Sequence, residues 1–98
     1  MLWNLKGPSE YSMEVLERCD SELTTLRKRV QEWMKDEEEN RETPLYNVLE
    51  TLLGFIGVCL DKLDLLFVET SLWGADEDEI NNLVAHVDFA RDAYRQLL

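Results

Sequence analysis

The 98-residue chain is predicted to fold as an all-α, antiparallel three-helix bundle with long helices. Within 16–33, 45–66 and 80–97, apolar residues recur in alternating steps of three and four positions. This spacing places the apolar side chains of each stretch on one face of a helix, as helices packed side by side require. The connections between the stretches are short, so consecutive helices run up, down and up. Pairing of two copies into a larger bundle is an open alternative to a monomer.

Length and composition indicate a single domain. We expect residues 1–8 to form a short tail that ends in a Gly-Pro turn, and residues 9–98 to form the bundle. A hydrophobic content of 45% argues against wholesale disorder. The longest apolar run without a charge, 51–60, is about half as long as a membrane span requires. Because the first residues also lack a signal-peptide pattern, a cytoplasmic protein is predicted.

Capping signals indicate where the first and third helices begin. The first helix is predicted over 10–39, and the hydroxyl of Ser9 or Ser12 would cap its first turn. The third begins at an aspartate version of the capping box, Asp76 with Glu79 three residues later, and runs to the end of the chain.

The second helix begins at the clearest local signal, a threonine N-cap at Thr43 followed by Pro44 at the first helical position. It is predicted to continue to about residue 70. Apolar residues flank its main stripe on both sides, which predicts that both neighbouring helices cover it. Its two glycines, Gly54 and Gly57, indicate a close approach between helices or a local bend.

Acidity is the strongest bias of the composition, with a net charge of −11. Such a surface repels nucleic acid and anionic membranes and attracts basic partners, although it also serves solubility. Two acidic runs lie at helix ends, expected about 35–45 Å apart from the rise of a helix. The dipole of a helix disfavours the first run and favours the second. The candidate acidic binding residues are Asp36, Glu37, Glu38, Glu39 and Glu42 in the first run, and Asp76, Glu77, Asp78 and Glu79 in the second.

Aromatic residues are expected at both ends of the bundle. The topology brings Trp3, Tyr11 and Trp73 to one end and Trp33 to the other. A tryptophan at such a place either closes the core or forms an exposed patch. The first three residues are the candidate apolar part of a partner-binding surface.

Residues that often carry catalysis lack suitable partners in the sequence. Cys19 and Cys59 fall inside the core stripes of different helices, which indicates reduced packing thiols. His86 is the single histidine and is expected at the boundary of the bundle or on its surface. The sequence contains no CxxC motif, no HExxH motif and no pair of histidines, so it suggests no zinc site. We therefore predict no catalytic residue, no metal ligand and no cofactor.

One pattern of carboxylates provides an enzyme alternative. Glu38, Glu39 and Glu42 read as EExxE, and Asp61 and Asp64 follow in the second helix. This pattern resembles the EExxE…ExxD signature of the MazG-type all-α nucleoside triphosphate pyrophosphatases. The resemblance implies that these five carboxylates hold Mg²⁺ for pyrophosphate hydrolysis. The chain departs from that signature in having Asp61 where glutamate is usual and in placing EExxE in a linker, so we do not assign it to the family.

The sequence therefore predicts a small acidic protein-binding module that is not an enzyme. The expected partner is a basic protein, or the nucleic-acid-binding groove of one, which the acidic surface would occlude. Nucleic acid and membranes are not expected as direct partners. A phage-type anti-defence inhibitor and an immunity protein for a basic toxin both fit, and a secretion-type chaperone or adaptor is an alternative. A further alternative is a purely structural module that only dimerises.

Overall fold

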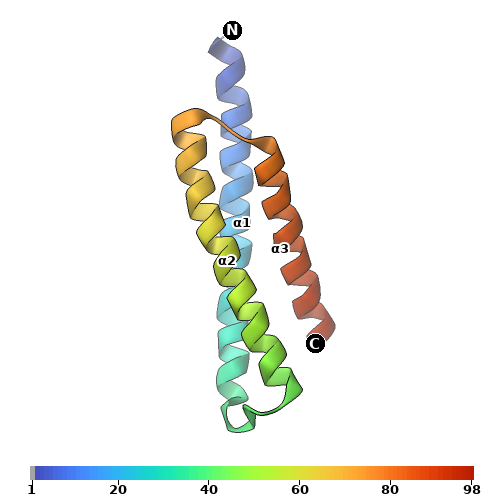
Figure 1. The fold of residues 1–98 in the computed structure, drawn as a ribbon. Coiled ribbons are helices and arrows are strands. Elements are labelled where there is room, and N and C mark those ends of the chain that lie inside the picture. Colours follow the sequence, from blue (N-terminus) through green and yellow to red (C-terminus); the bar gives the residue numbers. More distant parts are fainter. Residues whose placement is uncertain (1) are drawn as a thin grey trace.

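The computed structural model describes the backbone of residues 2–98 and the side chains of residues 11–98. Three long helices alternate in direction, each packs against the other two, and no strand occurs within 2–98 (Figure 1). The molecule is a rod of 59 × 21 × 17 Å. The predicted antiparallel three-helix bundle is confirmed. Its elements are α1 (Leu2–Asp36), the short 3-10 helix η1 (Glu38–Asn40), α2 (Pro44–Trp73) and α3 (Glu77–Leu97).

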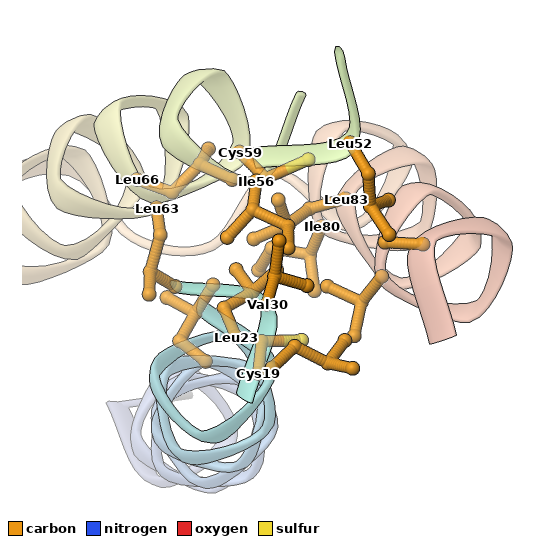
Figure 2. Packing of buried hydrophobic residues seen from close by; sticks show 14 of the residues in the cluster. Cys19, Leu23, Val30, Leu52, Ile56, Cys59, Leu63, Leu66, Ile80 and Leu83 are labelled. Atoms are coloured by element: carbon orange, nitrogen blue, oxygen red, sulfur yellow. The ribbon is translucent and has the colours of Figure 1, made fainter. Parts of the chain in front are cut away.

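The core consists of the three predicted apolar stripes. Figure 2 shows side chains of all three helices, among them Leu23, Ile56 and Leu83, pointing toward one another between the helices. The stripe ends pack against this core as partly buried residues, including Trp33 and Leu45. The buried hydrophobic residues are Leu16, Cys19, Leu23, Leu26, Val30, Leu49, Leu52, Ile56, Cys59, Leu63, Leu66, Ile80, Leu83, Val87 and Ala90.

Helix α1 begins earlier and ends sooner than predicted. It starts at Leu2, so residues 2–8, expected as a tail, are helical and extend past the connection between α2 and α3 (Figure 1). Pro8 is the seventh residue of α1, beyond the first turn, so its missing N–H removes one backbone hydrogen bond of the helix, yet the helix continues through it. The helix stops at Asp36, and the residues after it form η1 and a turn.

The start of α2 is the one the sequence predicts. The Thr43 hydroxyl accepts a hydrogen bond from the Tyr46 backbone N–H at 3.2 Å and donates one to the Asn40 carbonyl at 2.7 Å. Pro44 occupies the first turn, where its missing N–H costs no helical hydrogen bond. The cap satisfies a backbone N–H that would otherwise be unpaired in the first turn of α2.

The connection between α2 and α3 depends on one glycine and one aspartate. Gly74 has a φ of +94°, and its N–H donates to the Thr70 carbonyl at 3.2 Å, which ends α2. The Asp76 carboxylate then accepts hydrogen bonds from the N–H groups of Asp78 and Glu79, at 3.1 and 3.3 Å. The aspartate half of the predicted capping box is therefore present.

The glutamate half of that box has a different role. Glu79 accepts a hydrogen bond from the Lys62 ammonium at 3.0 Å, so its carboxylate ties α3 to α2. This hydrogen bond and the charge of Glu79 raise the pKa of Lys62.

The two glycines inside α2 do not allow a close approach between helices, so that part of the sequence interpretation is wrong. A Cβ atom added at Gly54 or Gly57 would meet no atom within 4 Å. Both positions have open space beside them because α1 and α3 pack on the other side of α2.

Candidate binding surface

The two acidic runs lie at opposite ends of the rod. The first occupies the end of α1 and the connection to α2, and the second occupies the connection to α3 and the start of that helix (Figure 1). Helix α2 separates the two connections, and its 30 residues span about 45 Å. This agrees with the separation expected from the sequence, so a single small partner contact cannot cover both runs.

The first run extends beyond the last turn of α1. Because the helix ends at Asp36, most of these carboxylates lie beyond it, in η1 and the turns on either side of η1. Glu38 pairs with Arg41 at 3.3 Å, and Glu37 accepts a hydrogen bond from the Asn40 amide at 3.2 Å. The others in this run, Asp36, Glu39 and Glu42, are exposed and form no ion pair with any described side chain.

The second run divides into structural and free carboxylates. Asp76 caps α3 and Glu79 binds Lys62, so both have partners within the fold. Glu77 and Asp78 are exposed and form no ion pair with the side chains of residues 11–98. They are the carboxylates of this run that can meet another molecule.

Two of the three predicted aromatic residues lie at this same end and face solvent. Trp73 is 84% exposed and borders an open hollow of about 580 Å³ with Glu77 and Asp78. Tyr11 is also exposed, and it borders a hollow of about 370 Å³ between α1 and α3 that Glu77 again lines. The side chain of the third residue, Trp3, lies outside the described residues. Aromatic and acidic side chains therefore adjoin at the α2–α3 connection.

The tryptophan at the opposite end behaves differently. Trp33 is partly buried against the core and makes an edge-to-face contact with Tyr94, with ring centres 5.9 Å apart. Trp33 closes the core, whereas Trp73 at the other end is exposed.

The carboxylates of the EExxE…ExxD resemblance do not form a metal site in the described part of the chain. Within it, no group of three or more Asp, Glu, His or Cys side chains is placed to hold a metal ion. Glu38, Glu39 and Glu42 lie in η1 and the turn before α2, while Asp61 and Asp64 lie within that helix. At the rise of a helix, Asp61 is about 25 Å from the start of α2.

The cysteines and the histidine occupy the places expected for them. Both thiols are free and buried. Burial raises the pKa of Cys19 to about 11, helped by the charges of Glu22 and Asp88, and burial raises the pKa of Cys59 as well. A neutral, buried thiol is a poor nucleophile. His86 is exposed and packs edge-on against Phe55, with ring centres 5.8 Å apart.

An exposed apolar stripe along α2 is absent from the sequence prediction. Val58, Leu65, Val68 and Leu72 are exposed on the outer side of this helix. Residues 58, 65 and 72 recur every seven positions, as the buried residues of the same helix do, and this spacing is the signal that could have revealed a second apolar face. Both neighbouring helices pack against α2 as predicted, and the exposed stripe lies on the outer face that neither of them covers.

No protein-family model, no curated protein and no solved structure matches this chain. Within residues 2–98, no helix combines the length and the apolar character needed to cross a membrane.

Proposed function

We propose that this protein is a cytoplasmic protein-binding module that inhibits a basic partner by occluding the surface with which that partner binds nucleic acid. The contact is the end of the bundle at the α2–α3 connection, with the acidic run at the other end as a second contact. The single observation that supports this best is the exposed Trp73 side chain beside the free carboxylates of Glu77 and Asp78.

The physical reason lies in how protein interfaces gain their affinity. A large aromatic side chain that leaves water on binding is a common energetic centre of an interface. Carboxylates around it attract a basic surface and orient it during encounter. An indole that is 84% exposed gains little from burial within its own chain, so burial by a partner would stabilise it more.

The proposal is tested with neutralised variants of the full chain. Affinity capture at low salt identifies a binder, whose affinity is then measured with purified proteins by isothermal titration calorimetry. Replacing Glu77→Gln together with Asp78→Asn is expected to weaken binding at least about tenfold, the effect of losing 1.4 kcal/mol. Trp73→Ser is expected to have a similar effect.

A matched control separates a specific contact from general acidity. The double variant Glu17→Gln with Asp20→Asn removes the same charge from exposed positions near the middle of α1, outside both acidic runs. It is expected to retain most of the affinity, and circular dichroism checks that every variant keeps its helices. Equal losses in the control and in the Glu77/Asp78 variant would refute a contact at this end.

A further inference from the structure

The outer face of α2 carries a stripe of exposed aliphatic side chains, in which Asp61 separates Val58 from the other three. Exposure is 66% at Val58, 52% at Leu65, 55% at Val68 and 66% at Leu72. Side chains of residues two positions apart along a helix point in directions that differ by about 200°. Leu65 therefore points away from its buried neighbour Leu63, and the stripe lies opposite the core.

The fold gives this stripe no covering element. Single exposed aliphatic residues are ordinary on protein surfaces, whereas contiguous apolar patches mark places where another molecule binds. From Val58 to Leu72 the stripe is about 21 Å long, which is four turns of helix. A surface of this shape fits the apolar face of a second helix lying along it.

The charges around the stripe indicate what kind of helix would fit. Asp61 lies within the stripe one turn before Leu65, and helical spacing places Asp64 on one edge and Glu69 on the other. The one cation in this part of α2, Lys62, is already held by Glu79 at 3.0 Å. The rim of the stripe is therefore acidic.

This rim favours one occupant over another. A second copy of the chain packed on the same face would bring its own carboxylates against these, and each copy carries a net charge of −11. A helix with lysine or arginine beside its apolar face would instead pair with them. The stripe also ends at Leu72, next to Trp73 and the acidic end of the bundle, so one partner could bind both surfaces.

We propose that the outer face of α2 docks an amphipathic helix of the basic partner, with the apolar residues of that helix on Val58, Leu65, Val68 and Leu72 and its Lys or Arg residues on the flanking carboxylates. This inference rests on the proposed function, because it requires a basic partner, and it adds where and in what form that partner binds.

The test uses the full chain and synthetic peptides of about 18 residues, long enough to cover the stripe as a helix. The probe peptide has leucines on one helical face and lysines on both flanks. One control peptide has the same composition with the leucines scattered around the helix, and another has glutamates in place of the lysines. Affinity is measured by calorimetry, and the site is mapped by amide chemical shifts in nuclear magnetic resonance spectra.

The probe peptide is expected to bind at least tenfold more tightly than either control and to shift the amides of residues 58–72. Leu65→Gln is expected to weaken its binding at least tenfold. Val48→Gln, which also replaces an exposed valine on α2 outside the stripe, is expected to leave binding unchanged. Both replacements lie on the surface, so the fold tolerates them.

Four results would overturn the inference. The first is that the probe peptide does not bind, and the second is that the scattered peptide binds as tightly as the probe peptide. The third is that amide chemical shifts change only at the acidic ends of the bundle. The fourth is that the chain forms a dimer in sedimentation experiments and that Leu65→Gln dissociates it. The third result would leave the proposed function intact. The proposed function fails separately if neutralising Glu77 and Asp78 does not affect binding of the captured partner.

Discussion

One added methyl group is expected to change the stability of this protein in opposite directions at two glycines. At Gly57, inside α2, an added Cβ meets no atom within 4 Å, so Gly57→Ala should stabilise the fold by about 0.5–1 kcal/mol. At Gly74 the φ of +94° strains any residue with a side chain, so Gly74→Ala should cost about 1–3 kcal/mol. Urea unfolding followed by circular dichroism measures both, and effects of the same sign would contradict this account.

The buried thiol of Cys19 makes stability depend on pH in the alkaline range. Its pKa is raised by burial from 9.0 to about 11, so the unfolded chain loses this proton at a lower pH than the folded chain. The contribution of the protonated Cys19 thiol to the free energy of unfolding is therefore complete below pH 9.0. It is lost as the pH rises toward about 11. The Cys19→Ala variant should show a smaller loss of stability over this range in unfolding experiments at several pH values. An identical loss in both proteins would show that the thiol does not contribute.

At the scale of elements, the start of α3 depends on the Asp76 side chain. Asp76→Ala removes the acceptor of two backbone N–H groups and should cost about 1 kcal/mol, while Asp76→Asn or Asp76→Ser should retain most of the stability. Thermal unfolding of the three variants provides the measurement. If asparagine proved as damaging as alanine, the negative charge, and not the cap, would be the stabilising feature.

The first residue of a helix could be predicted where a few neighbouring residues form a clear cap. Thr43 with Pro44 marked the start of α2, and Asp76 marked that of α3, because capping depends on a few neighbouring residues. The ends of α1 were predicted less well, since Gly7 and Pro8 lie within the helix and the chain leaves it at Asp36. The cap predicted at Ser9 or Ser12 is wrong, because both residues lie inside α1.

The core could also be predicted, because periodicity alone specifies a buried face. The cover of α2 by two neighbouring helices was predicted correctly, but the exposed apolar stripe on its outer face was not predicted. In a bundle of three helices each helix has only two neighbours, so Val58 and Leu65 stay exposed. The close approach expected at Gly54 and Gly57 failed for the same reason, since their side of α2 faces no other element.

At the scale of the whole molecule, the separation of the two acidic runs followed from helix lengths, but their division into structural and free carboxylates did not. Glu79 pairs with Lys62 across 17 positions of sequence, a contact that no local pattern announces. The exposure of Trp73, in contrast to the packing of Trp33, depends on how the helices end relative to one another. Such relations appear only once the helices are assembled.

We propose that this protein meets its partner through a negatively charged exterior with exposed apolar residues. The affinity for the captured partner as a function of salt tests this most directly, since the range over which charges interact shortens from about 10 Å at 0.1 M salt to about 3 Å at 1 M. We predict that the dissociation constant rises steeply over this range, and less steeply for the Glu77→Gln/Asp78→Asn variant. A dissociation constant that stays constant from low to high salt would contradict the account.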